Sequence, residues 1–380
     1  MFRVVIAGGG VAALEATLAL RALAEERVSI DVIAPDQDFV YRPLSVAEPF
    51  RVAETRTFPL APLVDAAGGS AVSGRVSAVD LEDRVVLTEE GAQHSYDAAL
   101  VALGASPREA VEGAVTFAGP KSAPALQAVL DDLLAGAVHK IAFAVPTGVT
   151  WPLPLYELAL LTGSFALDHC AEDVKIVLVT PEDRPLALFG AEAGEAIAEL
   201  LDARGIELRL RTTAGSFQDG ELRIAPGGSI EAERVIALPR LEGPHLEGLP
   251  CDRHGFLPID DLCRVGGEPD VFAAGDATQF PLKQGGIATQ QADTAAAGIA
   301  ALAGAPVEPE PFKPVLRGLL MTGMAPRYLR SEPGGTSSDV DTEPLWWPPA
   351  KIVGKHLAPF LATKLGLSEF EAGAHVGPPA

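Results

Sequence analysis

The sequence predicts an α/β fold of two three-layer units, each built around a parallel sheet, and three observations predict it. An apolar, β-branched run at residues 4–7 leads through three glycines into a helix-like stretch rich in Ala, Leu and Glu. A second series of strand and helix patterns begins at His139. A late apolar run at residues 271–274 ends in Gly-Asp and is expected to return to the first unit.

Composition and charge bound the class of protein. The 380 residues leave room for two or three domains, on a prior of about 150 residues each. Hydrophobic residues make up 48% of the chain and charged residues only 21%, a folded rather than a disordered composition. The net charge of −22 repels nucleic acid and anionic lipid at long range, so we expect small-molecule partners and no nucleic acid.

The cysteines and the amino terminus exclude further classes. Cys170, Cys251 and Cys263 are widely spaced and show neither a C-x-x-C pair nor zinc-ligand spacing. We therefore expect no disulfide framework and no metal site. The first residues open straight into a strand-like run, and no apolar window reaches the about 18 residues of a membrane span. The chain is interpreted as cytoplasmic.

The first unit opens with a βαβ pattern. Strands are expected at residues 4–7 and 28–34, with Pro35 ending the second. Short β runs between residues 71 and 97 then predict an antiparallel meander, which leads into a buried strand at residues 98–103.

The second unit repeats this pattern without repeating the letters. Its expected elements are strands at 140–145, 174–181, 206–210 and 235–241 and helices at 156–162 and 191–204. The predicted division is a first domain at residues 1–105 and 242–305, a second domain at 106–241, and a proline-rich C-terminal interface segment at 306–380.

A glycine-rich loop joins the first strand to the first helix. In this G-x-G-x-x-A pattern Gly8 permits the tight turn, Gly10 lets a pyrophosphate approach the backbone, and Ala13 allows close packing of helix on sheet. Val11 and Ala12 lie at the helix start, where free N–H groups and the helix dipole favour an anion. The alternative is an ordinary glycine-rich turn.

An acidic residue after the second strand is expected to bind an adenosine ribose. Asp31 lies within that strand, whereas Asp36 follows Pro35 and is able to turn back toward the crevice. We choose Asp36, and the alternative is that neither residue has this role.

The late strand ends in Gly275-Asp276. A glycine there brings backbone close to a ligand, and the carboxylate lies at the carboxyl end of a strand, where open α/β sheets bind their ligands. Gly-Asp alone is a common turn, but together with the amino-terminal loop it indicates a nucleotide cofactor.

These segments resemble the FAD-binding elements of a known superfamily. GGGVAA, YDAALVALGA and VFAAGDATQFPLKQGGIATQQAD are similar to those of the two-dinucleotide-binding-domain flavoproteins, the pyridine nucleotide-disulfide oxidoreductases. Within them the chain resembles the sulfide:quinone reductase and type II NADH dehydrogenase branch over residues 1–305. The resemblance implies two Rossmann-like domains, the FAD domain being split by a degenerate NAD-type domain. It also implies a non-covalent FAD, since no His or Cys motif indicates a covalent tether.

The resemblance further implies roles for individual residues. It places Val76 near the adenine, Asp276 at the ribityl chain, and Lys283 at a helix start facing the flavin pyrimidine ring, where a cation stabilises negative charge. The alternative for Lys283 is a solvated surface lysine. Further residues implied to lie beside the cofactor are Arg42, Pro43, Ala102, Leu103, Gly104, Gly275, Gly286 and Ile287.

The second unit departs from a dinucleotide-binding pattern. After its first strand the chain reads PTGVTWPLP, in which one glycine remains and the prolines remove donors. Trp151 would obstruct a pyrophosphate, so tight binding of NADH or NADPH is not expected. The loop instead resembles the sulfide:quinone reductase segment near the flavin, which places Trp151 beside the cofactor.

That segment of the reductases carries a redox cysteine, and none is present here. Sulfide oxidation through flavin-side persulfides therefore has no visible nucleophile. What remains is Glu157, which the resemblance places close to the flavin, where a partly buried carboxyl relays protons. The alternative is a glutamate of the first helical turn that only meets the helix dipole.

The C-terminal segment contains two basic, apolar stretches between residues 312 and 364, separated by Trp346-Trp347. This pattern suits the membrane–water interface, so peripheral contact with the inner face of a membrane is one hypothesis. The favoured alternative is a pair of helices packed on the FAD domain or at a homodimer interface.

These observations predict an FAD-dependent oxidoreductase, similar to sulfide:quinone reductase but without its redox cysteines. It would pass electrons from an unidentified small-molecule donor to a quinone or a similar acceptor. Two alternatives stay open: an NAD(P)H dehydrogenase with a divergent second domain, and a nearly inert flavin-binding partner subunit.

Overall fold

The first sheet is five-stranded and wholly parallel, with strand order β20-β9-β1-β2-β5. The computed structural model describes residues 1–171, 173–332 and 338–365. The strands are β1 (Phe2–Ala7), β2 (Val28–Ala34), β5 (Ser70–Ser73), β9 (Ala98–Val101) and β20 (Val271–Ala273). Residues from the start of the chain and from beyond position 270 thus share one sheet, as the sequence predicts.

The two faces of this sheet are covered differently. Helices α1 (Val11–Ala24), α2 (Leu60–Ala66) and α6 (Gly285–Leu302) pack on one face through a core rich in Ala, Leu and Ile. The other face is covered by the predicted antiparallel meander, β6 (Val76–Asp80), β7 (Val85–Thr88) and β8 (Gln93–Ser95). A ribbon of β3 (Asp38–Tyr41) and β4 (Arg56–Pro59) lies beyond the end of β2.

The second unit repeats this arrangement. Its parallel sheet has the order β11-β18-β12-β13-β14. Its elements are β11 (Val115–Thr116), α3 (Ala123–Leu134), β12 (Lys140–Ala144), α4 (Leu153–Asp168), β13 (Lys175–Val179), α5 (Gly190–Asp202), β14 (Ile206–Arg209) and β18 (Arg234–Ala237). The antiparallel strands β15 (Thr213–Gln218), β16 (Glu221–Ala225) and β17 (Ser229–Glu231) cover one side. The predicted fold class, with two units of like pattern, is confirmed.

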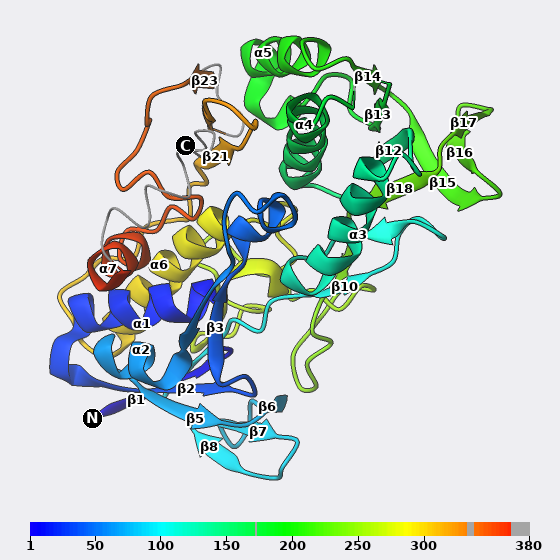
Figure 1. Ribbon diagram of the computed structural model, residues 1–380. Helices are drawn as coiled ribbons and strands as arrows, with labels where there is room; N and C mark the ends of the chain where they lie inside the picture. The colour runs from blue at the N-terminus through cyan, green and yellow to red at the C-terminus, as the bar shows by residue number, and fades with distance from the viewer. Residues whose placement is uncertain (172, 333–337, 366–380) are drawn as a thin grey trace.

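The chain crosses between the units in a two-stranded ribbon. Strand β10 (Ser106–Arg108) leaves the first unit and pairs antiparallel with β19 (Arg240–Glu242), which returns to it. Figure 1 shows the first unit below and the second above, with the C-terminal elements beside both. The two predicted boundaries between the units lie at this ribbon, and the division itself stays a prediction.

The C-terminal segment corrects one expectation, because its first basic stretch is not a helix. It forms an antiparallel sheet of β21 (Leu316–Leu320), β22 (Arg327–Ser331) and β23 (Ser338–Asp341). Gly318 lies in β21 where an added Cβ would come within 2.7 Å of Leu153 and 2.8 Å of Phe189. Only the second stretch is helical, as α7 (Leu357–Leu365).

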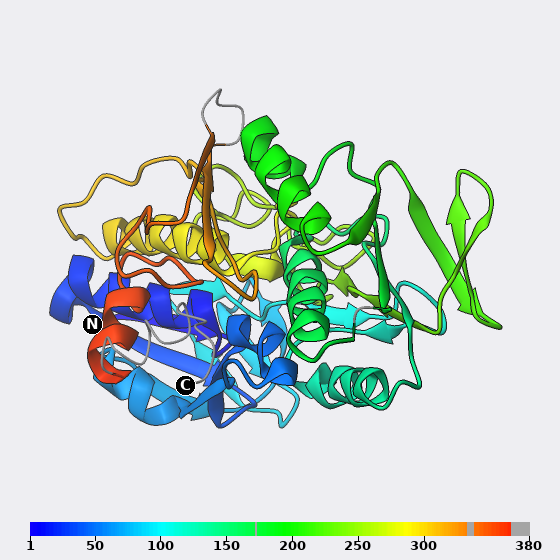
Figure 2. The same ribbon diagram turned by 45° about the horizontal axis from the view of Figure 1, so that its top comes forward.

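This segment joins the two units. The sheet β21–β23 shares a hydrophobic core with α4 and the second unit, whereas Ile352, Leu357 and Leu361 pack into the core of the first unit. Figures 1 and 2 both show α7 beside α1. A membrane and a second copy of the chain both stay predictions for the partner of residues 312–364.

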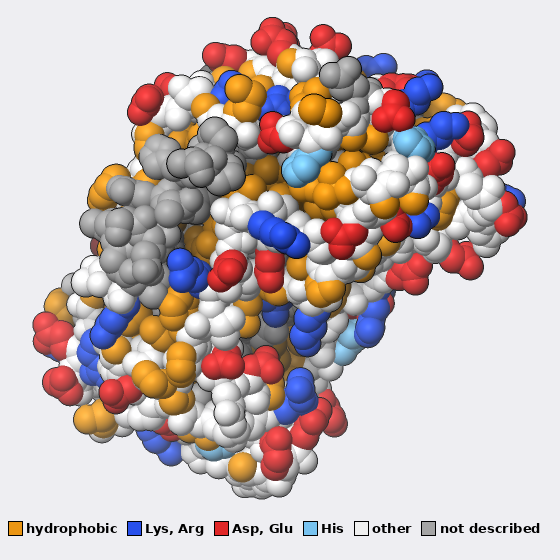
Figure 3. Space-filling view, in the orientation of Figure 1, with side chains coloured by type: hydrophobic (Ala, Val, Ile, Leu, Met, Phe, Trp, Pro, Cys, Tyr) orange, Lys and Arg blue, Asp and Glu red, His pale blue; other side chains and the backbone are white. Residues whose placement is uncertain are grey.

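Two further surface observations follow. Among the described residues, no helix is both long and apolar enough to cross a bilayer. On the face shown in Figure 3, acidic side chains are widely spread, with Lys and Arg interspersed and no broad basic area.

Replacement of Phe272 tests the packing of the first sheet. Its side chain is fully buried in β20, and the ring lies 2.8 Å from where a Cβ on Gly298 of α6 would stand. Phe272→Ala is expected to lower the free energy of unfolding by about 3–5 kcal/mol. Leu302→Ala, at a side chain 44% exposed, should have a much smaller effect in the same denaturant titration. Equal losses would contradict this packing.

Candidate active site

The loop after β1 is shaped by backbone contact with the neighbouring strand. Gly8 has a φ of +122°, and its N–H donates to the carbonyl of Ile33 at 2.8 Å. A Cβ at this position would stand 2.2 Å from the carbonyl oxygen of Ala102, just beyond β9. Only glycine combines this φ with this approach, so the turn fixes the first helix against two strand ends.

The start of α1 offers an open anion-binding cradle. Gly10 caps the helix without a side-chain cap, and a Cβ there would meet no atom within 4 Å. The first intrahelical bond runs from Leu14 N–H to Gly10 O at 3.1 Å. The N–H groups of Val11, Ala12 and Ala13 have no partner within the helix. Free donors, dipole and open space at one point fit a diphosphate.

The Gly-Asp turn meets this loop directly. Gly275 has a φ of +78°, and a Cβ there would lie 3.2 Å from the Cβ of Ala288 and 3.5 Å from that of Ala12. The Gly275 N–H donates to Gln291 Oε1 at 2.8 Å. The turn therefore lies between the first turns of α1 and α6. The two motifs that the sequence separates most widely are in contact.

The other residues predicted for the nucleotide end lie along the same edge of the sheet. Asp36 is exposed, two residues beyond the end of β2, and the Gly74 N–H donates to Ala34 O at 3.1 Å just before Val76 begins β6. Leu103 and Gly104 follow β9, and Gly104 has a φ of +71°. Their roles toward a cofactor stay predictions.

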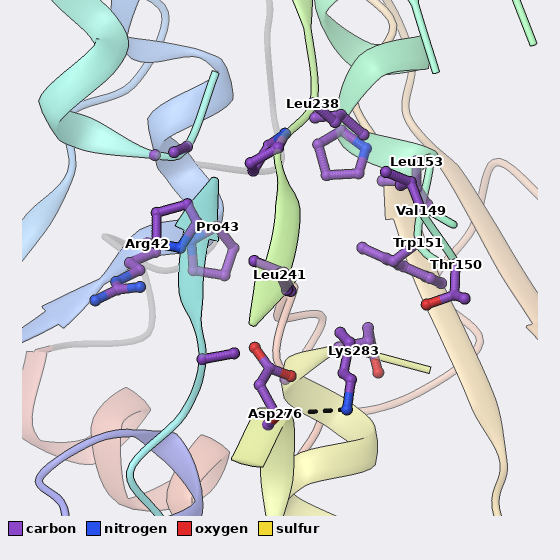
Figure 4. A pocket seen from close by; sticks show the side chains of 18 of the residues that line it. Arg42, Pro43, Val149, Thr150, Trp151, Leu153, Leu238, Leu241, Asp276 and Lys283 are labelled. Atoms are coloured by element: carbon purple, nitrogen blue, oxygen red, sulfur yellow. Dashed lines mark hydrogen bonds between the residues drawn. The ribbon is translucent and has the colours of Figure 1, made fainter. Parts of the chain in front are cut away.

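A cavity of about 480 Å³ continues from this crevice between the two units, a size within the range of ligand pockets. Its walls come from the first unit, the second unit and the C-terminal segment. Figure 4 shows Arg42 and Pro43 across the cavity from Trp151 and Val149, with Asp276 and Lys283 side by side. The predicted site residues that line it are Arg42, Pro43, Trp151, Glu157, Asp276 and Lys283.

Asp276 connects the crevice to the cavity. Burial raises the pKa of its carboxyl, and the nearby Lys283 and Arg42 cations act in the opposite direction. The residue lines the cavity directly after the Gly275 turn. It is therefore placed to accept a hydrogen bond from a hydroxyl of a bound molecule.

Lys283 is not the solvated surface lysine of the alternative interpretation. Its Nζ donates to Asp276 O at 3.3 Å and to Thr278 O, and it lies 3.8 Å from the centre of the Phe256 ring. Burial lowers the pKa of the amine to about 8, although Asp276 and Asp252 partly oppose the shift.

The start of α6 shows how the Ile287 N–H is used, while the place of Ile287 beside a cofactor stays a prediction. The helix begins at Gly285, and the side chain of Gln284 caps it by accepting from the Ile287 N–H at 2.9 Å. That N–H is thus satisfied within the cap and does not face a ligand. Gly285 and Gly286 supply the remaining donors at this helix start.

Glu157 is more deeply placed than the sequence indicates. Because α4 begins at Leu153, Glu157 lies beyond the first turn, which corrects the alternative that it only meets the helix dipole. Its side chain is 1% exposed, and Oε1 accepts from the Met321 N–H at 2.8 Å and from Lys351 Nζ at 2.6 Å. Burial raises the pKa of Glu157, and Lys351 opposes that shift.

The loop before α4 has prolines where a pyrophosphate-binding loop offers N–H donors, and weak binding of NAD(P)H stays a prediction. Pro152 is the N-cap and Pro154 lies in the first turn, so the donors that α1 offers are reduced here. Thr150 Oγ1 donates to Pro281 O at 2.5 Å, which ties the loop to the first unit. The Trp151 ring packs edge-on against Phe189 with centroids 5.9 Å apart.

The sequence analysis did not identify two charged residues near the site, Glu182 and Lys351. Glu182 follows β13 as Asp36 follows β2, so its position in the sequence could have marked it as a candidate ribose-binding residue. Its carboxylate is, however, already hydrogen-bonded to other groups of the protein. It accepts from Tyr156 Oη at 2.7 Å, Thr180 Oγ1 at 2.8 Å and the Ala187 N–H at 3.1 Å. Lys351 lies in the second basic stretch of the C-terminal segment, and no local pattern marks its pairing with Glu157, 194 positions away.

Comparisons with known proteins agree with this geometry. Residues 156–297 match the family model described as pyridine nucleotide-disulphide oxidoreductase. The fold resembles the sulfide:quinone oxidoreductase of Aquifex aeolicus with a TM-score of 0.80 and 17% identity, over 90% of this chain and 87% of the other.

The family match of residues 156–297, the fold and the relatives support the class of an oxidoreductase of the pyridine nucleotide-disulfide oxidoreductase superfamily, whose members are flavoproteins.

Two curated proteins are similar to this chain in sequence. An NADH dehydrogenase-like protein of Mycobacterium tuberculosis (strain ATCC 25618 / H37Rv) is 28% identical over 300 residues, 73% of this chain and 72% of the relative. The ferredoxin–NAD(+) reductase component of the biphenyl dioxygenase system of Paraburkholderia xenovorans is 27% identical over 226 residues, covering 56% of this chain and 51% of the relative.

The buried environment of Lys283 predicts that its amine loses its proton at a lower pH than a surface lysine does. In flavin-free protein its amine should lose a proton near pH 8, whereas a surface lysine does so near about 10.4. The ¹³Cε resonance of Lys283, assigned by its loss in Lys283→Arg, measures this directly. A Lys283 midpoint above pH 10 would contradict the buried placement.

Proposed function

We propose that this protein binds FAD non-covalently along the crevice and passes electrons from a small-molecule donor to a quinone-type acceptor. The observation that carries the proposal is the contact between the open Gly10 cradle and the Gly275-Asp276 turn, which leads into a cavity of about 480 Å³. A cradle for a diphosphate, a carboxylate for hydroxyls and a cavity for a ring system occur in the order of the parts of FAD.

The residues present fit this cofactor. The N–H groups at the start of α1 would hold the diphosphate, and Gly10 leaves the space that the phosphates need. Asp276 would accept from a ribityl hydroxyl. Asp36 and Val76 lie toward the adenosine end, and Lys283 lies on the cavity side, where its positive charge would favour negative charge on the ring. Bound FAD would supply the two-electron redox chemistry.

The cavity walls favour a flat, largely apolar acceptor. Trp151, Leu238 and Leu241 give apolar surface, and Phe117 and Phe280 add aromatic rings. Polar and charged side chains, among them Glu157, Lys283 and Lys351, lie between these apolar surfaces, and apolar walls with placed polar groups are typical of small-molecule sites. A quinone matches this lining because its ring is apolar and its two carbonyl oxygens need donors.

Lys351 and Glu157 supply a donor and a proton site on this wall. An ammonium group has three N–H donors. Lys351 gives one to Glu157 at 2.6 Å and one to Pro43 O at 3.3 Å. The third remains for a carbonyl oxygen of the acceptor. Glu157, buried with a raised pKa, is suited to hold a proton and pass it through Lys351 as the acceptor takes up electrons.

An NAD(P)H donor is the alternative that the NADH dehydrogenase-like relative favours. The second unit argues against it. The acidic residue in the ribose-binding position, Glu182, is already hydrogen-bonded to Tyr156 and Thr180, and the loop before α4 carries prolines. The nearly inert flavin-binding subunit is a third hypothesis, and catalytic turnover by the isolated chain would exclude it.

Gly10→Ala separates cofactor binding from folding. An added Cβ meets no protein atom, and the φ of −90° suits alanine, so the free energy of unfolding of the flavin-free protein should not fall. The methyl group stands where the phosphates would approach, and we expect FAD affinity to fall about tenfold or more, roughly 1.4 kcal/mol. Fluorescence titration with FAD measures it.

The matched variant is Gly8→Ala, which meets the Ala102 carbonyl at 2.2 Å and should destabilise the fold itself. Unchanged FAD affinity in Gly10→Ala would exclude the cradle as the diphosphate site.

Glu157→Gln tests proton handling. The amide keeps the shape but holds no exchangeable acid proton, so flavin reoxidation by a soluble quinone should slow by about 10²-fold. Because Glu157 has a raised pKa, the wild-type rate should change with pH as that carboxyl titrates, and the variant should lose this limb. Stopped-flow absorbance at several pH values measures both.

Glu182→Gln is the control, because it alters a part-buried carboxyl that does not line the cavity. A Glu157→Gln rate equal to that of the wild type at every pH would remove the proton-handling role.

Anaerobic mixing with NADH or NADPH tests the alternative donor. We expect the flavin absorbance of the wild type to persist for minutes, because the second unit offers neither a phosphate cradle nor a free ribose-binding carboxylate. Bleaching within seconds by a stoichiometric amount would make the chain an NAD(P)H dehydrogenase.

A further inference from the structure

One serine on the cavity wall has a hydroxyl without a partner. Ser45 belongs to the 3₁₀ helix Arg42–Val46 that follows β3, and the residue is only 2% exposed. It lines the cavity, and its Oγ forms no hydrogen bond with any residue that the structure describes. A hydroxyl removed from water without a new partner is costly. Its place on a cavity wall indicates that a bound molecule supplies the partner.

The start of a helix lies beside this hydroxyl. The 3₁₀ turn Pro120–Ser122 runs directly into α3, and Gly119 precedes the turn with a φ of +103°. A Cβ on Gly119 would stand 3.9 Å from Ser45 Oγ. Apart from its own chain neighbours, it would meet no other atom of the described residues within 4 Å. Both residues line the cavity, so the space between them is part of it.

The loop before this helix leaves the N–H of Gly119 available. The Ala118 N–H donates to Ser122 Oγ at 2.8 Å, and that hydroxyl donates to Gly119 O at 2.6 Å. These two bonds fix the loop. The Gly119 N–H itself has no acceptor within the described part of the chain. A backbone donor and a side-chain donor thus lie next to each other on one wall.

The charges around these two donors favour an anion. Neither the turn Pro120–Ser122 nor the first turn of α3 contains an acid, so the positive end of the helix dipole is not neutralised there. Lys121 adds an exposed cation. Arg42 lines the cavity three residues before Ser45, and residues at this spacing lie on the same side of a 3₁₀ helix.

The acids of the same cavity have partners of their own. Glu157 is ion-paired with Lys351, and Asp252 Oδ1 accepts from two backbone N–H groups. Lys283 lies beside Asp276 (Figure 4). The helix start has no such acid, so its positive potential is left for a ligand.

The side chains next to the two donors define the rest of that ligand. Val46 follows Ser45, Phe117 lies two residues before Gly119, and both are buried apolar residues that line the cavity. A phosphate group presents three oxygens and nearly two charges, more than one hydroxyl and one N–H can satisfy. A carboxylate has two oxygens and one charge, which match these two donors.

We propose that the Ser45 hydroxyl and the Gly119 N–H form a carboxylate subsite, which binds the electron donor as a monocarboxylate with an apolar body. This names the substrate class of the function proposed above, and the role of the bound molecule as donor rests on that function. Binding at the carboxylate subsite itself needs no flavin.

Benzoate and benzamide test the subsite in the wild type, because they have nearly the same shape and only benzoate carries a charge. Calorimetric titration of the FAD-loaded and the flavin-free protein measures both affinities. We expect benzoate to bind about tenfold more tightly than benzamide, since hydrogen bonds to a charged group are stronger. Inorganic phosphate should not bind. Equal affinity for the two probes, or binding of phosphate alone, would overturn the carboxylate subsite.

Ser45→Ala tests the hydroxyl. Loss of one hydrogen bond to a carboxylate should lower benzoate affinity about tenfold or more, and the affinity of benzamide should fall less. Ser77→Ala is the matched control, because it removes a part-buried hydroxyl of β6 that does not line the cavity. It should bind both probes as the wild type does. Wild-type benzoate affinity in Ser45→Ala would exclude this serine as a ligand.

FAD separates the carboxylate subsite from the cofactor site and from the proposed function. Displacement of benzoate by FAD would assign the two donors to the cofactor and overturn the proposal. If the protein takes up no FAD but still prefers benzoate through Ser45, the subsite stands and the proposed function fails. If FAD binds and quinone is reduced while benzoate does not bind, the proposed function stands and the subsite fails.

Discussion

The structure depends on the close approach of three strand ends to one helix start. The backbone of Gly8 lies so close to the carbonyl group of Ala102 that no side chain would fit at this position. Gly275 lies between Ala12 and Ala288. Small residues at these points let α1 and α6 converge on the carboxyl edge of the sheet, where the backbone donors of both helices face one crevice. A side chain at Gly8 would separate β9 from the loop and widen that crevice.

The C-terminal segment supplies one wall of the cavity. Its sheet shares a core with the second unit and its helix a core with the first, so the cavity wall is fixed from both sides. At the centre is the buried pair of Glu157 and Lys351, with exposed fractions of 1% and 9%. Desolvation makes such a pair a weak source of stability, and loss of one partner is costly. Its position on the cavity wall is the basis of the proton-handling role proposed for it.

The sequence predicts the fold and the crevice well, because the motifs that form them are short and local in sequence. Each of three patterns can be recognised within a short stretch of sequence: the strand-turn-helix, the meander and the Gly-Asp strand. That the first and the last come together follows from parallel-sheet topology, because the carboxyl ends of parallel strands lie at one edge. The prolines at the start of α4 also predict that this loop offers few N–H donors, and the structure has Pro152 at the N-cap and Pro154 in the first turn. The prediction of a helix at residues 312–330 was wrong, because the pattern of Leu and Arg there is compatible with both the helical and the strand period. The close packing of Gly318 against Leu153 and Phe189 favours the strand.

What could not be predicted arises from contacts between distant segments. Nothing near Lys351 indicates Glu157, and nothing near Glu15 indicates the start of α7. The Gln284 cap that occupies the Ile287 N–H is local, yet it is visible only once the helix start is known. Buried polar groups take partners from wherever the chain passes, so their pairing needs coordinates.

The visible absorbance of the purified protein tests the central claim most directly. The account predicts a yellow protein with a flavin spectrum, one FAD per chain released intact by acid or heat, and full reconstitution of the emptied protein by added FAD. A colourless protein that takes up no FAD would contradict it.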